Sequence, residues 1–319
     1  MTDDLAGPFV EPFVMISNLP ILTENLEMKE AKPIVSSQCA LGEGPVWDDK
    51  RERLFWVDIL GKSVHWADEY GGNHRIFNTT DYVSNIYLTE PGDELVLCLT
   101  DGFYLWLPES GDLKKWVDLP DYDPAIRTND GFCDVHGNLW IGTMALSEDP
   151  DQGKLYLLDN DMKWHVMLDQ TSISNGIRCL PDGETYYYID TPTQQLREYR
   201  FDPKSCTWRW VRNVIEFPVS QGHPDGMSMD AEGRLWVSLW NGYGVACVDP
   251  ESGDIVDRIE VAAPQVSANI FGGQHNDQLY ITTARKLLSD EILAEYPKTG
   301  DLFHARLDVQ GGKTYRRSV

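Results

Sequence analysis

VHGNLWIGTM at 135–144 and AEGRLWVSLW at 231–240 are two copies of one element, in which a polar turn precedes a short run of apolar and aromatic residues. Related copies are DDKRERLFWVDI at 48–59, PGDELVLCLT at 91–100, PDGETYYYID at 181–190 and HNDQLYITTA at 275–284. Successive copies stand 41, 44, 47, 49 and 44 residues apart when aligned on Leu54, Leu95, Leu139, Tyr186, Leu235 and Leu279. A repeat of about 40–50 residues that carries several strands is typical of a β-propeller blade.

A second strand-like element follows each copy. GKLYLLDNDM at 153–162 and GVACVDPESGD at 244–254 are examples, and each run ends in a polar turn with Asp, Asn, Pro or Gly. Val, Tyr, Trp and Phe favour pleated strands, whereas Gly, Asp and Pro interrupt them. Six copies of such a unit predict an all-β chain that folds as a six-bladed β-propeller, one domain over residues 39–319.

Residues 1–38 precede the first copy and have a different role in the predicted architecture. The last blade needs a strand that closes the ring, and the segment before Leu41 is the natural source of that strand. We therefore expect an N-terminal arm over residues 1–38 that supplies the closing strand, with Lys32–Gln38 as the candidate. Helical periodicity is limited to 21–31 and 286–296, which predict two short surface helices.

The charge balance excludes several kinds of partner. Lys and Arg total 27 and Asp and Glu total 51, so the formal net charge is −24. Such a negative field repels nucleic-acid phosphates and anionic membrane surfaces, so neither is an expected partner. No apolar run approaches the roughly 18–20 residues of a membrane helix, and the acidic start Met-Thr-Asp-Asp does not resemble a secretion signal. The expected location is the cytoplasm, where the six scattered cysteines would be buried free thiols.

Four segments carry polar residues that ordinary strands do not need. They are LGEGPVW (41–47), RTNDGFCD (127–134), SISNGIRCLPDG (172–183) and QGHPDGMSMD (221–230). Their candidate functional side chains are Glu43, Arg127, Asn129, Asp130, Asn175 and Asp225. Asn-Gly, Asn-Asp-Gly and Pro-Asp-Gly are also common turn signals, so a plain solvent-facing turn is the alternative for each segment.

The candidate side chains share one kind of donor atom. Glu, Asn and Asp offer hard oxygen ligands, which suit Ca²⁺, Mg²⁺ or Mn²⁺ better than metals that prefer thiolates. The sequence has no C-x-x-C pair, so a thiolate zinc site is not expected. Three protein ligands with open positions for water describe a catalytic rather than a structural metal site. Spacing alone leaves the turn alternative open.

The order of the motifs resembles a known family. LGEGPVW, RTNDG, GTM, SNG, PDG followed by IDT, GHPDG, and FGG with LYITTA follow one another between Leu41 and Arg306. This order is similar to that of the sugar lactonases that include gluconolactonase and regucalcin. The resemblance covers nearly the whole chain after the N-terminal stretch, and its strength comes from the complete series rather than from any one motif.

The resemblance implies a six-bladed propeller with one divalent cation in the central channel. By motif, the cation ligands would be Glu43, Asn175 and Asp225, and the substrate would face Arg127 and Asn129, with Asp130 adjacent. Ca²⁺ is the first expectation for the ion, with Zn²⁺, Mn²⁺, Mg²⁺ and Fe²⁺ as further candidates. The chain departs from the family in GTMALSEDP, where Leu146 and Ser147 stand at positions that carry carboxylates in regucalcin, so that only Glu148 or Asp149 offers an acid there.

The activity that the resemblance implies is hydrolysis of a small-molecule sugar lactone to the aldonic acid. Asp225 is our candidate general base, and His223 is an alternative base that we place at the rim. Two other functions are open: a metal-dependent esterase or phosphotriesterase on the same scaffold, and a calcium-binding regulatory protein without turnover. We expect a monomer or a small homo-oligomer.

Overall fold

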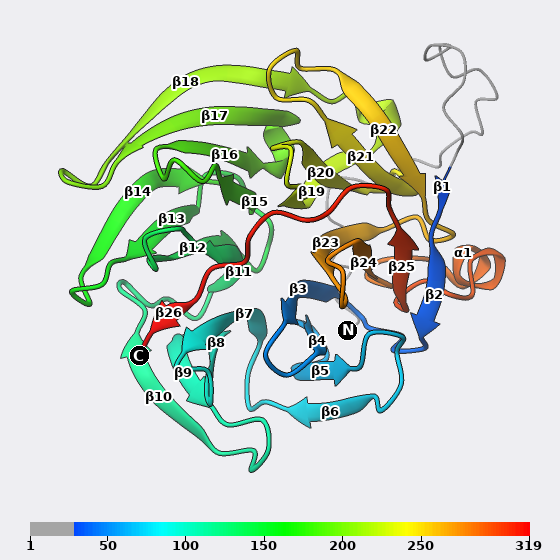
Figure 1. Cartoon of the computed structure of the whole chain (residues 1–319), viewed down its shortest axis with the longest axis horizontal. Helices are drawn as coiled ribbons and strands as arrows, with labels where there is room; N and C mark the ends of the chain where they lie inside the picture. The colour runs from blue at the N-terminus through cyan, green and yellow to red at the C-terminus, as the bar shows by residue number, and fades with distance from the viewer. Residues whose placement is uncertain (1–28) are drawn as a thin grey trace, which may run out of the picture.

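Six β-sheets stand around a common axis in the computed structural model, which describes residues 29–319 (Figure 1). Blade 1 consists of β3 (Gly42–Asp48), β4 (Arg53–Asp58), β5 (Ser63–Ala67) and β6 (Arg75–Asn78). Blade 2 consists of β7 (Val83–Glu90), β8 (Leu95–Leu99), β9 (Gly102–Trp106) and β10 (Leu113–Asp118). Blade 3 consists of β11 (Ile126–Cys133), β12 (Leu139–Ala145), β13 (Gly153–Leu158) and β14 (Trp164–Thr171).

The remaining three blades repeat the same antiparallel order. Blade 4 consists of β15 (Ser174–Cys179), β16 (Thr185–Asp190), β17 (Gln195–Asp202) and β18 (Thr207–Glu216). Blade 5 consists of β19 (His223–Met229), β20 (Leu235–Trp240), β21 (Gly244–Val248) and β22 (Ile255–Glu260). Blade 6 consists of β23 (Val266–Gly272), β24 (Gln278–Thr283), β25 (Leu302–Arg306) and β2 (Lys32–Val35).

The first strand of each blade forms the inner ring. Strands β3, β7, β11, β15, β19 and β23 contact one another in this order, and β23 closes the ring against β3. We call the space that they enclose the central channel. The six-bladed all-β propeller predicted from the repeat is therefore confirmed.

The N-terminal segment contributes two strands to the propeller. Strand β2 pairs antiparallel with β25, so residues from the start of the chain form the outermost strand of the last blade. The strand ends at Val35 and does not extend to Gln38. Strand β1 (Lys29–Glu30) pairs parallel with β22, which contradicts a helix at these two residues. Ala31 is not helical either, whereas residues 21–28 of the predicted helix and most of the predicted arm lie outside the described residues.

The few helices and the cysteines complete the fold. Helix α1 (Asp290–Glu295) lies within the predicted helical segment at 286–296, and the Ser289 side chain caps it. No helix among residues 29–319 is long and apolar enough to cross a membrane. All six cysteines are free thiols, four of them buried and two half-buried. Burial raises the pKa of the Cys98 thiol to about 12, which keeps it neutral.

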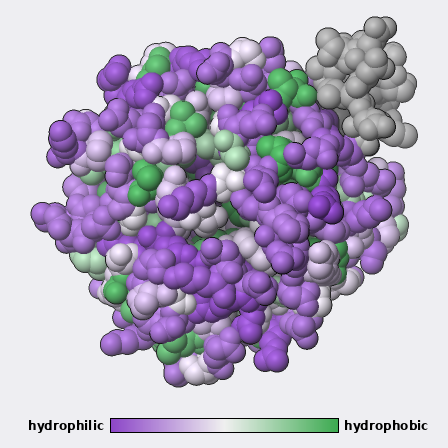
Figure 2. Space-filling view, viewed as in Figure 1, coloured by the Kyte–Doolittle hydropathy of each residue, from purple (hydrophilic) through white to green (hydrophobic). Residues whose placement is uncertain are grey.

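The two ends of the channel differ. The C-terminal segment crosses the end at which the inner strands finish, and it reaches β26 (Arg317–Ser318), which pairs parallel with β7 (Figure 1). The backbone N–H groups of Gly311 and Gly312 donate to Asn276 and Met229. A cavity of about 300 Å³ lies at this end, bordered by residues of the inner strands and of the C-terminal segment. Figure 2 shows the same face as a largely hydrophilic surface.

Buried polar anchors hold the aromatic residues between the blades. The carboxylate of Asp134, which is fully buried, accepts hydrogen bonds from Trp140 Nε1 at 2.8 Å and from the Tyr186 hydroxyl at 2.9 Å. Asp230 accepts in the same way from Trp236 Nε1 at 3.0 Å. Each Asp precedes its Trp by six residues, so the repeated element carries its own anchor. A buried acceptor of this kind is costly to remove because its donors lose their only partner.

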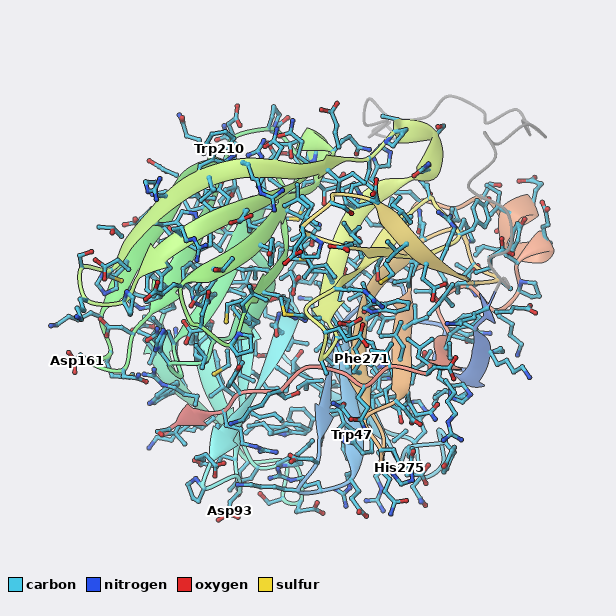
Figure 3. The ribbon with its side chains drawn as sticks, turned by 45° about the horizontal axis from the view of Figure 1, so that its top comes forward. Trp47, Asp93, Asp161, Trp210, Phe271 and His275 are labelled. Carbon is cyan, nitrogen blue, oxygen red and sulfur yellow. The ribbon has the colours of Figure 1, made fainter. Side chains whose placement is uncertain are left out.

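We predict that Asp134→Ala lowers the free energy of unfolding by about 3 kcal/mol or more, because buried N–H and O–H donors are left without an acceptor. Urea unfolding followed by tryptophan fluorescence measures the change. Asp161→Ala is the control, since that side chain is 81% exposed and lies at the edge of the molecule (Figure 3), and it should change stability by less than about 0.5 kcal/mol. Equal effects of the two substitutions would contradict the anchor role.

Candidate functional site

Every inner strand is interrupted near its start by a shift in pairing with the next strand of its blade. In four blades two residues of the inner strand stand opposite a single residue, at positions 44–45, 129–130, 175–176 and 225–226. Such β-bulges bend a strand and re-aim its side chains. The candidate site residues of the four segments therefore lie within strands, and the turn alternative does not hold for them, whereas Pro181-Asp182-Gly183 is indeed a turn after β15.

Glycine is required in these bulges because neighbouring inner strands approach closely. A Cβ atom on Gly176 would stand 2.8 Å from the carbonyl oxygen of Asp225 on the next blade. A Cβ atom on Gly226 would stand 2.7 Å from the Cβ atom of Ala268, again on the next blade. The Asn-Gly and Asp-Gly pairs thus combine a polar side chain with a backbone that lets the ring close.

A chain of hydrogen bonds joins three blades at the level of the bulges. Arg127 Nη1 donates to Asn129 Oδ1 at 2.6 Å, and Asn129 Nδ2 donates to Asn175 Oδ1 at 2.8 Å. Asn175 Nδ2 donates to the Thr191 hydroxyl at 2.7 Å, and that hydroxyl donates to the carbonyl oxygen of Pro224 at 2.7 Å. Each donor fixes the orientation of the next group, so the amide oxygen of Asn175 has one defined direction.

Two carboxylates lie at the same level with few partners. The side chains belong to Glu43 and Asp225, residues that are each 6% exposed. Glu43 Oε2 accepts a hydrogen bond from its neighbour Gly44 at 3.3 Å. Asp225 Oδ1 is buried and has no hydrogen-bond partner among residues 29–319. A buried carboxylate oxygen without a donor is unusual, and it marks a place where an external group would be stabilising.

Both carboxylates have a pKa above the ordinary value of their residue type. Burial, and then the charge of Asp130, raise the pKa of Glu43 to about 8, although Arg127 opposes the shift. Burial, and then the charges of Glu43 and Asp130, raise the pKa of Asp225 well above its ordinary value. The carboxylates thus repel one another and favour protonation when nothing positive lies between them.

These features fit a divalent cation. The unsatisfied Asp225 oxygen, the mutually repelling carboxylates and the oriented Asn175 amide oxygen form a set of hard oxygen donors. Among the described residues no three His, Cys, Asp or Glu side chains group as metal ligands. That finding agrees with a donor set of only two carboxylates and one amide. Glu43, Asn175 and Asp225 are therefore the residues that could hold the ion.

The other predicted site residues lie in β11, and their environments differ. Arg127 is buried, and its Nη1 makes two hydrogen bonds, to Asn129 and to the carbonyl oxygen of Thr128. Burial lowers the pKa of Arg127, whereas the nearby Glu43 and further carboxylates raise it. Asp130 instead accepts hydrogen bonds from Asn85 Nδ2 at 3.2 Å and from the N–H of Gly131 at 2.7 Å. Its carboxylate is thus tied to blade 2.

His223 is held in one tautomer beside the site. Gln194 Nε2 donates to two carbonyl groups, so its Oε1 accepts the hydrogen bond from His223 Nδ1 at 2.7 Å. Nε2 of this imidazole is then the unprotonated nitrogen. Burial lowers the pKa of His223, which keeps the ring neutral near pH 7.

Sequence reasoning missed two features of the site. Thr191 links Asn175 to Pro224, and the motif IDT was the available signal, although no role was assigned to it. Glu148 forms an ion pair with Lys286, 138 residues away in the chain. No local sequence pattern predicts that contact, because it depends on how the ring of blades closes.

Comparison with known proteins agrees with the geometry. Residues 41–285 match the profile of the SMP-30/Gluconolactonase/LRE-like region. YvrE of Bacillus subtilis, provisionally named a sugar lactone lactonase, is 37% identical over 275 residues, which cover 86% of this chain and 94% of YvrE. A 6-deoxy-6-sulfogluconolactonase of Pseudomonas putida is 31% identical over 283 residues, which cover 88% of this chain and 96% of that protein.

The solved structures give the same result. A regucalcin from Agrobacterium tumefaciens, described as a calcium-binding protein, superposes with a TM-score of 0.85 at 26% identity. The superposition covers 92% of this chain and 100% of that chain. Because the profile matches well over half of the residues, the chain belongs to the SMP-30/gluconolactonase/LRE-like family.

Proposed function

We propose that this protein is a metal-dependent lactonase that hydrolyses a sugar lactone to the aldonic acid. The observation that carries the proposal is the buried, unsatisfied Asp225 Oδ1, which faces the same site as the oriented Asn175 amide and the Arg127–Asn129 pair. The named relatives support the choice of reaction, since YvrE and the Pseudomonas putida enzyme both carry names of lactonases.

Glu43, Asn175 and Asp225 would hold one divalent cation, with Ca²⁺ as the first candidate. The Agrobacterium tumefaciens regucalcin is described as calcium-binding, which supports that choice. When bound, such a cation supplies Lewis-acid polarisation of the lactone carbonyl and stabilises negative charge on its oxygen. A bound cation would also offset the charge of Asp130, which after burial raises the pKa of Glu43.

The remaining chemistry falls to side chains of the channel. Arg127 uses Nη1 within the protein, so its Nη2 and Nε donors face the substrate and hydrogen-bond sugar hydroxyls or the ring oxygen. Asn129 orients that guanidinium. The Asp225 carboxylate oxygen that does not hold the cation accepts the proton of the attacking water, whose oxygen bonds to the carbonyl carbon. The ring C–O bond breaks, and its oxygen takes up the proton, so that one water adds across the ester.

The overall charge favours release of the product. The lactone is neutral and the aldonate is an anion, whereas the protein carries a formal charge of −24. A negative field around the channel repels an anionic product more than a neutral substrate. The cytoplasmic location and the monomeric or small oligomeric state stay predictions from the sequence.

The proposal is tested by assaying aldonolactones with chelator-stripped protein, to which Ca²⁺, Mn²⁺, Zn²⁺, Mg²⁺ or Fe²⁺ is returned singly. A pH-indicator assay should show acid release only when a cation is present. Asp225→Asn should lower kcat by about 100-fold or more, whereas Asp169→Asn on the exposed outer strand β14 should not. Turnover of aryl esters or phosphotriesters alone would favour the esterase alternative, and a bound ion without turnover would favour the regulatory protein.

We predict that Arg127→Met lowers kcat/KM for the lactone by about 10- to 1000-fold, because an oriented donor to the substrate is lost. Arg127→Lys should not restore the activity, since an ammonium lacks the planar fork. Calcium affinity, measured by isothermal titration calorimetry, should not fall when a neighbouring positive charge is removed. Arg209→Met, at an exposed position of β18, is the control. Full activity in Arg127→Met would refute the assigned role.

The raised pKa of Glu43 predicts how the metal-free protein responds to pH. The folded protein holds a proton on this carboxyl up to about pH 8, whereas the unfolded chain releases it near 4.5. Stability should therefore fall as pH rises between these values, by up to about 1.4 kcal/mol per pH unit for one such group. Urea unfolding at several pH values measures the slope. Glu43→Gln or saturating Ca²⁺ should flatten it, and an unchanged slope would contradict the shift.

A further inference from the structure

The ion pair between Glu148 and Lys286 spans the end of the channel at which the site lies. Glu148 follows β12, whose last residue pairs with the first residue of β11, and Lys286 follows β24, whose end pairs with the start of β23. Both segments therefore lie at the end where the inner strands begin. Blades 3 and 6 are three positions apart in a ring of six, so they face each other across the axis (Figure 1).

Hydrogen bonds hold the backbone on both sides of the ion pair. In blade 3, Glu148 N–H donates to the Ala145 carbonyl at 3.0 Å, and Glu148 has a left-handed φ of 61°. This conformation is uncommon for a residue other than glycine. In blade 6, the N–H of Arg285 donates to the Ala40 carbonyl at 3.1 Å.

The ion pair and the buried carboxylates lie at the same end of the channel. The ammonium of Lys286 acts on Asp225, whose pKa it lowers against the larger effect of burial. The charge of Glu148 in turn raises the pKa of Arg127, against the larger effect of burial. Arg127, Asn175 and Asp225 are only 5%, 4% and 6% exposed. A lactone can reach them only if groups at the mouth move aside.

The ion pair can part at small cost. Its side chains are 39% and 21% exposed, so both are long, partly solvated groups. An exposed ion pair contributes little and is screened by salt, so it opens without disturbing the blades.

We propose that Glu148 and Lys286 form a strap across the mouth that determines which lactones are admitted. Compact monosaccharide lactones pass during brief openings, whereas lactones that carry a second sugar ring are disfavoured because the strap cannot close over them. This inference rests on the proposed lactonase function and names the substrate class, single-ring lactones.

The test compares glucono-1,5-lactone with cellobiono-1,5-lactone, which carries an additional glucosyl ring. It uses the cation-loaded, full-length protein and the variants Lys286→Glu, Glu148→Lys and the double exchange. Each single charge reversal should raise kcat/KM for the larger lactone relative to the smaller by roughly fivefold, the factor that one weak exposed ion pair supplies. The double exchange restores the attraction and should return the ratio to that of the unaltered protein. The ratio is informative even if the new charge near Asp225 slows both reactions.

The matched control is Lys62→Glu. Lys62 pairs with Asp81 at 3.3 Å and lies at the same end of the propeller, but it joins adjacent blades 1 and 2 and is 42% exposed. The substitution changes the net charge as Lys286→Glu does and should leave the substrate ratio unchanged. A ratio that is unaffected by Lys286→Glu, or that the double exchange does not restore, would overturn the strap.

Failure of the strap is distinguishable from failure of the lactonase proposal. If the unaltered protein hydrolyses neither these two lactones nor any other aldonolactone of the panel, the proposed function is wrong. The strap is then judged by a double-mutant cycle on the free energies of unfolding, in which an absence of coupling between positions 148 and 286 overturns it. Coupling without any change in the substrate ratio of an active enzyme would show an ion pair that has no part in selection, and this too would overturn the proposal.

Discussion

The close packing of six inner strands around one axis is the constraint on which both fold and site depend. In each inner strand, the pairing with the next strand of the same blade is interrupted near the start. In four blades that interruption contains or adjoins a polar residue of the site. The bulge directs the side chain inward, and glycine lets the neighbouring backbone approach, as Gly176 does beside Asp225. The same few residues therefore let the ring of blades close and supply the polar side chains of the channel.

The buried carboxylates of the channel carry an unfavourable electrostatic energy that no group of the fold fully offsets. Burial raises the pKa of both Glu43 and Asp225, the charge of Asp130 adds to both shifts, and the charge of Glu43 adds to the shift of Asp225. Arg127 offsets part of this charge, but its own burial is unfavourable. Buried carboxylates without matching cations destabilise a protein, and such arrangements are typical of functional sites rather than of structural cores. The proposed divalent cation would satisfy the carboxylates and the Asn175 oxygen together, and its binding would then also stabilise the channel.

Most of the fold could be predicted because the repeat is local, whereas pairings between distant segments could not. Spacing and alternation within each copy predict blades, and the six sheets follow from them. Asn175-Gly176 and Asp225-Gly226 were ambiguous because a hairpin turn and a bulge favour the same residues, and only the partner strands distinguish the two. The helix expected at 21–31 was wrong at Lys29 and Glu30, since their pairing with β22 lies more than 200 residues away. The Glu148–Lys286 contact was equally invisible, because ring closure creates it.

The contrast between the two ends of the channel shows where a substrate must pass. At one end the C-terminal segment is held by backbone hydrogen bonds from Gly311 and Gly312 and by the pairing of β26 with β7. The buried Arg317 adds hydrogen bonds to carbonyl groups of blade 3, including that of Gly137 at 3.0 Å. Opening this end breaks several such bonds at once. At the other end Glu148 and Lys286 form an ion pair of partly solvated side chains, and parting them costs little. The end that opens easily is the end where the bulges place the carboxylates, and traffic to the site therefore runs through the Glu148–Lys286 strap.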